Sequence, residues 1–595
     1  MDIRSCEGIN SLFISMFSDS NIAKKFQVGR TKCGYVTKFG IAPYFLDLLY
    51  KEILLSPVFV ISFDESLNRS IQKGQMDIIV RFWNHESNQV FTRYLDSQFL
   101  GGANSKQLLK SFNEGVSQLN IQKMIQISSD GPNVNLKFLR LVKEDRELNE
   151  YPALLDIGTC GLHTVHGSLK TSVNNSEWKL GEKLKAMWKF LNECPSHREI
   201  YENVAENKVY PLPYCGHRWC ENQNCCERAA NIFPGYLKFI EHLQSLPKSK
   251  QPHGKWFNVL KDTIKDPLFI AKLKFVEFIA EKLNIFLKGF QCDKPMFRFI
   301  FDVLKNILVS ILSMFLLNDV MERSDTIKKI MKLNLTDPML YKREDTIDIG
   351  LSANMEVQKY KRLSTSKGSI ISKFYKDVCI FLSSLATHML EKSPIKYLLV
   401  RCSSCLDPIQ LADSREVECN KLKFSKLLQQ LVASGYLKSK IGDKANEEYF
   451  QFIINIVRKH DTEFLSFKKY DDRLDIFLAQ HIPVNGYTSL WDVCIILFCL
   501  SHGQAAIERG FKVNKDYLVE NLGEDSLIAL RIVHDHMLSK QQNAADIPIT
   551  REMMKSVKSS RMRYDVALES AKKVKELSTV SLKRKAVSAE IDDTV

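Results

Sequence analysis

The stretch PVFVISFDES, residues 57–66, decides the fold of this chain. It is a short apolar run that closes on acidic and polar residues, a pattern that is typical of a buried strand rather than of a helix. Two segments rich in β-branched and aromatic residues follow at 76–84 and 89–99, separated by the turn-prone residues HESN. Because each connection is too short for a crossover, the sequence predicts three consecutive antiparallel strands over 57–99.

The sequence that follows extends this pattern into a compact α/β unit. Residues 105–119 have helical spacing with Ser105 as a cap, and residues 124–132 are predicted to form a fourth strand that runs into a turn. The segment NVNLKFLRLVKED is predicted to be a second helix, and residues 153–169 are predicted to begin as a strand and continue as a helix. This order of strands and helices is typical of an α/β fold.

Helical periodicity dominates the rest of the chain. From Glu177 to roughly Gln480 almost every apolar run has helical spacing, and no period of 20–50 residues repeats, which argues against a solenoid. The first 50 residues are also predicted to be helical, and the stretch after about Gln541 is polar and basic. A length of 595 residues is about four times that of a usual domain, so several domains, or one domain with a large insertion, are expected.

Composition excludes several classes of protein. With 45% hydrophobic residues, 25 Gly and 17 Pro, the chain is neither largely disordered nor collagen-like. The longest apolar stretch, residues 307–317, is shorter than the roughly 20 residues that span a bilayer. The first residues lack a secretory pattern, so we expect an unsecreted protein in which the 15 cysteines are reduced thiols.

Two carboxylates mark the predicted strands. Asp64 is predicted to end the first strand and Asp130 the fourth, and strand ends in an α/β sheet bring distant side chains to one edge. Carboxylates held together repel each other unless a proton or a divalent cation is shared, as in two-metal phosphoryl chemistry. The alternative at this point is that both residues simply belong to turns.

Five segments follow one another in an order that is more specific than any one of them. They are FDES (63–66), SSDGPNVN (128–135), CGLHTVH (160–166), HRW (217–219) and HGQAAIERGFKVNK (502–515). This order resembles that of the hAT transposases, a family with an RNase H-like fold and a catalytic triad of two Asp and one Glu. In that family a CxxH segment follows the second Asp, an RW pair precedes a large helical insertion, and the Glu lies in a C-terminal dimerisation region. The resemblance covers roughly residues 20–540.

The resemblance implies a role for seven residues. The catalytic triad that holds two Mg²⁺ or Mn²⁺ ions would be Asp64, Asp130 and Glu508. The DNA-binding pair would be Arg218 and Trp219, and the active-site neighbours would be Cys160 and His163. The implied activity is metal-dependent DNA strand cleavage and transfer by a homodimer or higher oligomer, with DNA as the partner and no membrane.

The implied fold is an α/β RNase H-like core interrupted by a large all-α insertion, with a helical N-terminal segment and a C-terminal dimerisation region. The expected boundaries are 1–55 for the helical segment, 56–220 for the first part of the core, 221–480 for the insertion, 481–540 for core completion and dimerisation, and 541–595 for a basic, partly disordered tail.

Simpler readings of the same residues stay open. Glu508 is next to Arg509, so a surface ion pair would explain it, and Trp219 could belong to a core. Cys160, His163 and His166 share a helical face, where zinc ligation or plain packing would both fit. The cluster from Cys215 to Cys226, with His217 and Cys220 between, also allows zinc or burial. The pair Cys402 and Cys405 is expected to lie at a buried junction of a helix and a loop.

The chain departs from the family pattern in two places, and the first of them favours a second hypothesis. The 63 residues before Asp64 hold only Cys6 and Cys33 and no histidine, so the N-terminal BED zinc finger of the family is expected to be missing. Lys512 stands where the family usually has Ser. The alternative is therefore a domesticated or truncated relative that dimerises and binds DNA or protein without cutting; a generic RNase H-like nuclease is a third, weaker option.

The charge is unevenly distributed. The net charge is +14, and residues 201–450 contribute +10 and residues 551–595 contribute +4 of it. We therefore expect the surface that attracts phosphate to lie on the insertion and tail, with salt-dependent binding. The cluster Lys583, Arg584 and Lys585, with Lys572 and Lys573 upstream, loosely resembles a nuclear import signal, so the nucleus is expected, and otherwise the cytoplasm.

Overall fold

Helices make up most of the chain, and its strands form one small mixed sheet. The computed structural model describes residues 6–68, 72–102, 104–363, 368–483, 485–517, 522–541 and 543–592, except the side chains of residue 7 and residues 574–592. The chain divides into two units. The first comprises Met1–Ile127, Lys137–Val142 and Ala506–Val595, and the second comprises Ser128–Leu136 and Lys143–Ala505.

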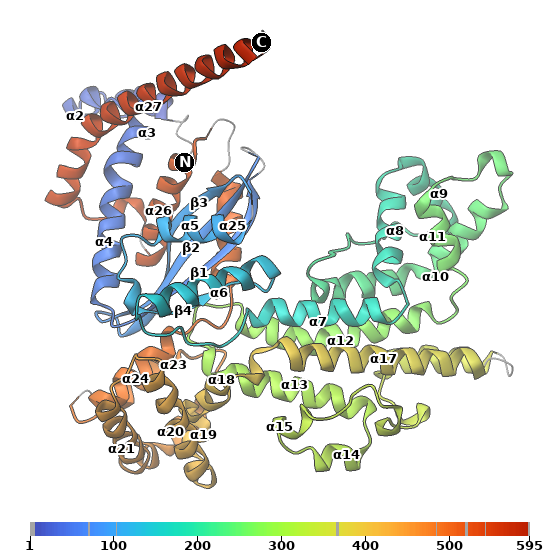
Figure 1. Cartoon of the computed structure of the whole chain (residues 1–595). Helices are drawn as coiled ribbons and strands as arrows, with labels where there is room; N and C mark the ends of the chain where they lie inside the picture. Colours follow the sequence, from blue (N-terminus) through green and yellow to red (C-terminus); the bar gives the residue numbers. More distant parts are fainter. Residues whose placement is uncertain are drawn as a thin grey trace. The chain divides into compact units, whose positions relative to one another are not determined.

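The sheet confirms the strands predicted from 57–99. Strands β1 (Phe59–Asn68), β2 (Lys73–Asn84) and β3 (Gln89–Leu100) are consecutive and antiparallel, and β4 (Met124–Ser128) completes the order β3-β2-β1-β4 (Figure 1). Since the sheet is mixed and its first two pairings are antiparallel, β4 runs parallel to β1. A register shift between Ile78 and Ile79 marks a bulge in the pairing of β2 with β3.

Two details of the strand prediction are wrong. Asp64 lies in the middle of β1 rather than at its end, because the pairing with β2 continues through Asn68. Residues 153–160 form no strand; they precede α7 (Gly161–Asn175), and their backbone bonds to loops. The amide of Ala153 donates to the carbonyl of Ser434, and that of Cys160 donates to the carbonyl of Ser129. An apolar segment can thus be buried without a strand neighbour.

Helices cover both faces of the sheet in the first unit. Phe63 of β1 packs against Phe112 of α5 (Ser105–Gly115) and Phe138 of α6 (Asn133–Leu148), with ring centroids 6.0 and 5.0 Å away. On the opposite face, α4 (Ala42–Leu55) and α26 (Glu524–Lys540) enclose Tyr94 of β3 in a second apolar cluster. Successive residues of a strand face opposite sides, so Asp64 lies on the face opposite to Phe63.

The two ends of the first unit pack against each other (Figure 1). The long helix α27 (Arg551–Asp592) contacts a π-helical turn at Thr37–Ile41. At Gly40 a Cβ would lie 3.1 Å from the Cα of Val557, so a larger residue would require the neighbouring helix to shift by a few tenths of an ångström. The remaining helices of this unit are α1 (Cys6–Met16), α2 (Asn21–Lys25), α3 (Arg30–Val36) and α25 (Ala505–Tyr517).

The second unit is helical. Helix α7 packs along α17 (Gly368–Lys392) and α12 (Phe269–Phe290), and α17 also contacts α13 (Ile300–Phe315) (Figure 1). Within the described part of 221–480, the only β pairing is a single bridge between Leu316 and Tyr341. The other helices are α8 (Leu180–Asn192), α9 (Pro195–Ala205), α10 (Gln223–Ser245), α11 (Lys255–Thr263), α14 (Asn318–Arg323), α15 (Ile327–Ile330), α16 (Leu351–Arg362), α18 (Leu398–Cys402), α19 (Pro408–Ala412), α20 (Val417–Ala433), α21 (Ser439–Asn455), α22 (Asp461–Ser466), α23 (Leu474–His481) and α24 (Thr488–Cys499).

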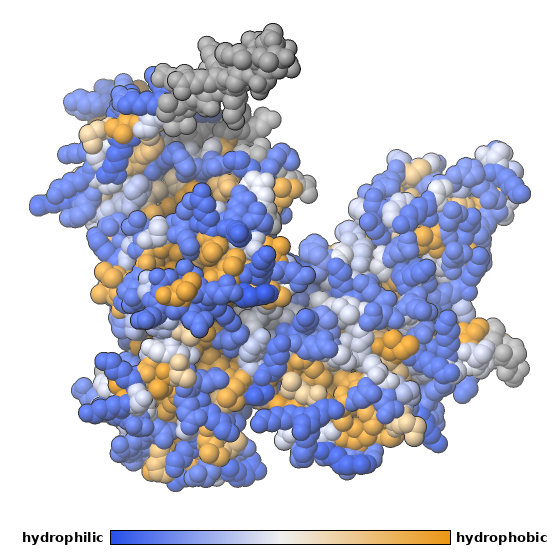
Figure 2. Space-filling model, in the orientation of Figure 1, coloured by the Kyte–Doolittle hydropathy of each residue, from blue (hydrophilic) through white to orange (hydrophobic). Residues whose placement is uncertain are grey.

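On the face drawn in Figure 2, hydrophobic residues are exposed in several separate groups. Hydrophilic residues separate these groups in both units. Among the helices of the described ranges, none combines the length and the apolar character needed to cross a bilayer. The predicted import cluster at Lys583–Lys585 is part of α27, but its side chains lie outside the described part of the structure.

Candidate functional site

Asp64 projects from the face of the sheet that α25 and α26 cover. It is directly opposite Asp77 in the pairing of β1 with β2, and residues paired in this way point to the same face. Asp64 is partly buried, and its Oδ1 accepts a hydrogen bond from the amide of Glu65 at 2.8 Å.

Asp77 anchors α25 and α26 to that face. Its Oδ2 accepts from the side-chain amide of Asn514 at 2.7 Å and from the guanidinium of Arg531 at 3.2 Å. Its Oδ1 accepts from Gln75 at 2.8 Å and from the Ser97 hydroxyl at 2.6 Å. A buried carboxylate needs such partners, because an unpaired charge in the interior costs several kcal/mol.

This anchoring brings Glu508 to the face that carries Asp64. Glu508 lies in the first turn of α25, six residues before Asn514, which is about 9 Å along a helix. Arg531 also donates to the carbonyl of Gly510 at 2.9 Å, where a Cβ would approach the guanidinium to 2.8 Å. Asp64 and Glu508 therefore share one face of the sheet in the first unit, and both are partly accessible.

Asp130 belongs to the second unit, two residues after the end of β4. Its Oδ1 accepts a hydrogen bond of 2.5 Å from the side-chain amide of the buried Asn135. The amide of Cys160, at the start of α7, donates to the carbonyl of Ser129 at 3.2 Å. The CxxH segment thus holds the loop that carries Asp130.

The segment that leads into α25 bonds to the same loop. The Ser501 hydroxyl lies 3.3 Å from the Ser128 hydroxyl, and the Gln504 amide donates to the carbonyl of Ser128 at 3.5 Å. Gly503 packs so closely on Leu162 of α7 that a Cβ would lie 3.1 Å from it. Parts of three of the five sequence segments therefore meet in the second unit, and the Asp64 segment and Glu508 both belong to the first.

The two histidines of the CxxH segment differ. His166 is buried and accepts a hydrogen bond from the amide of Cys220 at 3.3 Å. Burial, with smaller contributions from Arg218, His163 and His217, lowers the pKa of His166 to about 4, so the ring is neutral near pH 7. His166 thus packs as a hydrogen-bonded side chain, whereas His163 is partly buried one turn earlier.

The predicted DNA-binding pair is largely internal. Trp219 is 1% exposed and packs edge-on against Tyr214, with ring centroids 5.3 Å apart. Arg218 forms an ion pair with Glu221 at 3.2 Å and is 29% exposed. Stacking of Trp219 on a DNA base would require its side chain to leave this position, so its DNA contact stays a prediction.

Three of the four thiols around Trp219 are buried, and Cys215 is partly exposed. Burial raises the pKa of Cys225 to about 12 and raises the pKa values of Cys220 and Cys226 further. Among the described residues, none of these thiols belongs to a group of three potential metal ligands whose ligand atoms lie within 4.8 Å of one another. Cys402 and Cys405 are also buried, and burial raises the pKa of Cys405 to about 12.

A basic cavity lies beside Tyr214 in the second unit. It is an open hollow of about 560 Å³ whose walls include Lys179, Lys185, Lys255 and Trp256, and also Glu182, which forms an ion pair with Lys255 at 2.9 Å. The ammonium of Lys255 lies 5.2 Å from the centroid of the Trp256 ring, and that of Lys185 lies 5.8 Å from it. Lysines around an aromatic ring form a surface suited to phosphates and bases.

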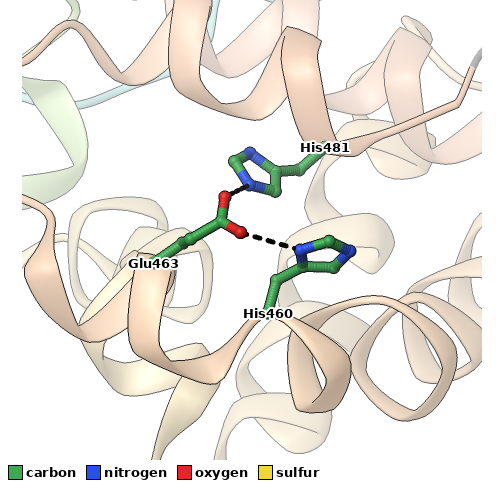
Figure 3. Close-up of side chains that lie close together, drawn as sticks. All are labelled: His460, Glu463 and His481. Carbon is green, nitrogen blue, oxygen red and sulfur yellow. Dashed lines mark hydrogen bonds and ion pairs between the residues drawn. The ribbon is translucent and has the colours of Figure 1, made fainter.

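One cluster of potential metal ligands was absent from the sequence prediction. His460, Glu463 and His481 bring their ligand atoms within 4.8 Å of one another (Figure 3). The spacing H-x-x-E at 460–463 is a usable signal, because residues three apart share one helical face. Its third member lies 18 residues further on and could be joined to it only by the fold.

Comparison with known proteins places the chain in no family. No model of a known protein family matches the sequence, and no curated protein matches it. The likeness to hAT transposases therefore rests on the five segments and on the positions of their residues.

Proposed function

We propose that this protein is a hAT-like transposase or a transposase-derived protein that binds DNA and cleaves and transfers its strands. The observation that carries the proposal is the anchoring of α25 on β2, which puts Glu508 on the sheet face of Asp64. The hydrogen bonds that tie Ser128 to Ser501 and Gln504 support the inclusion of Asp130, two residues after Ser128.

The strand order supports an RNase H-like core. Three antiparallel strands in chain order, with a fourth parallel to the first and next to it, put the carboxyl ends of β1 and β4 at the same edge. Asp64 lies in the middle of a long strand. This position supports a carboxylate that faces α25 and argues against a simple turn residue.

In this proposal Asp64, Asp130 and Glu508 supply oxygen ligands, which are the ligands that Mg²⁺ and Mn²⁺ prefer. Two such ions would activate the attacking water or 3′-hydroxyl and stabilise the leaving oxygen. The attacking oxygen bonds to phosphorus in line with the 3′-oxygen of the DNA, whose bond to phosphorus breaks to leave a 3′-hydroxyl. All three carboxylates are partly accessible, as this role requires.

The DNA surface in this proposal lies on the helical insertion and on the helices that directly precede it. Residues 201–450 carry a net charge of +10, and the cavity lined by Lys179, Lys185, Lys255 and Trp256 offers ammonium groups around one aromatic ring. Each phosphate neutralised releases condensed counterions, so affinity should fall steeply as salt is raised. A homodimer and location in the nucleus belong to the same proposal.

A second candidate is a catalytically silent, dimerising protein that binds DNA or protein. Two observations favour it: Trp219 is buried, and the Asn135 amide occupies one oxygen of Asp130. This candidate predicts the same DNA affinity and dimer without strand cleavage.

Cleavage of supercoiled plasmid in Mn²⁺ separates the two candidates. We expect the wild-type protein to nick the plasmid, and Asp130→Asn to lose activity at least about 100-fold with unchanged binding in a gel-shift assay. Asp145→Asn, an exposed carboxylate on α6, is the matched control and should cleave as the wild type does. Equal products from Asp130→Asn and the wild type would overturn the catalytic proposal, and binding without cleavage by the wild type would favour the silent protein.

A further inference from the structure

A histidine, a carboxylate and a second histidine converge between two short helices of the second unit. His460 precedes α22, Glu463 is in its first turn, and His481 ends α23. Glu463 lies between the rings: its Oε1 is 3.0 Å from Nδ1 of His460, and its Oε2 is 3.0 Å from Nε2 of His481 (Figure 3).

A backbone carbonyl and two aromatic rings fix the orientation of the His481 ring. Its Nδ1 lies 2.8 Å from the carbonyl oxygen of Phe477, which can only accept, so Nδ1 carries the proton. The rings of Phe464 and Phe477 pack against the imidazole, with centroids 5.0 and 4.5 Å away. Metal-binding histidines are usually held in this way, with the second nitrogen donating to a carbonyl or carboxylate.

This orientation requires a positive charge between His481 and Glu463. In the neutral ring, Nε2 of His481 presents a lone pair to Oε2 of Glu463, and two acceptors at 3.0 Å repel unless a cation lies between them. The cation is either a proton on the imidazole, which makes an ion pair, or a metal ion. Two imidazoles and one carboxylate are a ligand set that zinc and its neighbours in the first transition series prefer to Mg²⁺.

We propose that His460, Glu463 and His481 bind one divalent transition-metal ion of the Zn²⁺ type. Tetrahedral ligands at about 2.0–2.1 Å from zinc lie roughly 3.4 Å apart. The two N···O contacts of 3.0 Å, which end on different oxygens of Glu463, are close to this spacing, and the three ligand atoms, which lie within 4.8 Å of one another, would draw together around the ion. The site is accessible: the side chains of His460 and Glu463 are 45% and 57% exposed, whereas His481 is 10% exposed. Water would occupy the fourth position. The bound ion would join the end of α23 to the start of α22.

This site is independent of the proposed triad. All three of its residues lie in the segment 460–481 of the second unit, and Asp130, Asp64 and Glu508 are not among them. Its ligands also differ in kind, because the triad offers only carboxylates.

The test is a titration of the full-length protein with Zn²⁺ after treatment with a chelator. We expect calorimetry to show one site that is lost, or weakened at least about 100-fold, in His481→Ala and in Glu463→Gln. Replacing Zn²⁺ by Co²⁺ should give the intense visible absorption of a tetrahedral ion in the wild type only. Zn²⁺ should also raise the Tm of the wild type by a few degrees and leave that of His481→Ala unchanged.

Two controls keep the result specific. His253→Ala removes another exposed histidine of the second unit and should bind Zn²⁺ as the wild type does. Asp130→Asn distinguishes Zn²⁺ bound by the triad from Zn²⁺ bound at 460–481. This variant should bind Zn²⁺ at 460–481 as the wild type does. The proposal is overturned if the wild type fails to bind Zn²⁺, or if His481→Ala and Glu463→Gln bind it with wild-type affinity and stoichiometry.

Discussion

Asp77 in the first unit and Glu463 in the second each gather several side-chain partners, but burial gives them opposite roles. Asp77 is fully buried, and four donors from β2, β3, α25 and α26 satisfy its carboxylate. Glu463 is more than half exposed and lies between two imidazoles at the surface. The buried carboxylate is committed to holding elements together, whereas the exposed one can exchange its partners for a ligand.

The largest effect is expected for Asp77→Ala, which would leave Arg531 buried without its carboxylate. Removing one partner of a buried pair costs about 3–5 kcal/mol, so we expect about 4 kcal/mol in the free energy of unfolding of the first unit. Urea denaturation with a hydrogen-exchange readout on β2 measures it. Asp47→Ala breaks an exposed pair with Lys51 in the same unit and should change nothing measurable. A loss below about 1 kcal/mol for Asp77→Ala would contradict the anchoring role.

An intermediate effect is expected for Asp266→Asn in the second unit. Asp266 bonds to the ammonium groups of Lys183 at 3.0 Å and Lys272 at 2.8 Å, all three side chains being about 15% exposed. Loss of the carboxylate leaves two neighbouring ammonium groups, and we expect about 2 kcal/mol of destabilisation. Fluorescence of Trp178, which Lys272 overlies, reports on the region during denaturation. Asp262→Asn, in an exposed pair with Lys265, is the control.

The same residue gives a pH dependence. Burial alone would raise the pKa of Asp266, but Lys183 and Lys272 hold that pKa below its usual value. A depressed pKa means that the ionised carboxylate stabilises the folded state above the unfolded pKa of about 3.9. This contribution should disappear as the pH falls through the folded pKa, and Asp266→Asn should lack it. An unchanged acid profile in that variant would contradict the assignment.

A smaller effect of opposite sign is expected for Asp96→Asn on β3. Burial raises the pKa of Asp96 to about 6, which the hydrogen bond from Gln98 at 2.6 Å only partly offsets. The ionised form therefore destabilises the fold above pH 6, and stability should rise as the pH is lowered from 7 to 4. Asn should stabilise the first unit by about 1 kcal/mol at pH 7 and flatten this pH dependence. Destabilisation at pH 7 would show that the ionised carboxylate is needed there.

The smallest effect is expected for Glu463→Gln in protein freed of metal. The hydrogen bonds from His460 and His481 lower the pKa of Glu463, but the residue is at the surface, where water replaces lost partners. The Tm of the chelator-treated variant should equal that of the wild type. A large drop in Tm would place Glu463 with Asp77 as a structural anchor and would remove the distinction drawn between them.

The sequence predicted the elements better than their partners. Strands β1 to β4 and helices α5 to α7 are visible in local patterns, because alternation and helical spacing depend on residues close together in the chain. The strand expected from residue 153 failed because local apolarity cannot show that Ala153 bonds to Ser434. The ties of Asp77 to Asn514 and Arg531 span more than 430 positions, and no local pattern contains them.

The candidate site divides in the same way. The order of motifs singled out Asp64, Asp130 and Glu508, but only the sheet register and the Asp77 contacts put Glu508 on the face of Asp64. Trp219 shows what a motif leaves out, because the sequence around a tryptophan is the same whether its side chain is exposed or buried. In the structure Trp219 is 1% exposed. The pair His460 and Glu463 is visible in the sequence, but its partner His481 is not.

The separation between Asp77 and its partners also has a consequence for synthesis on the ribosome. Asn514 emerges 437 positions after Asp77, which at about 5–20 residues per second is roughly 20–90 s later. Throughout that interval the nascent sheet carries a carboxylate without the guanidinium and amide that will neutralise and cover it. The helical unit, whose pairings lie within the intervening chain, is complete before the sheet is. We therefore expect strands β1 to β3 to need protection by chaperones until α25 and α26 are made.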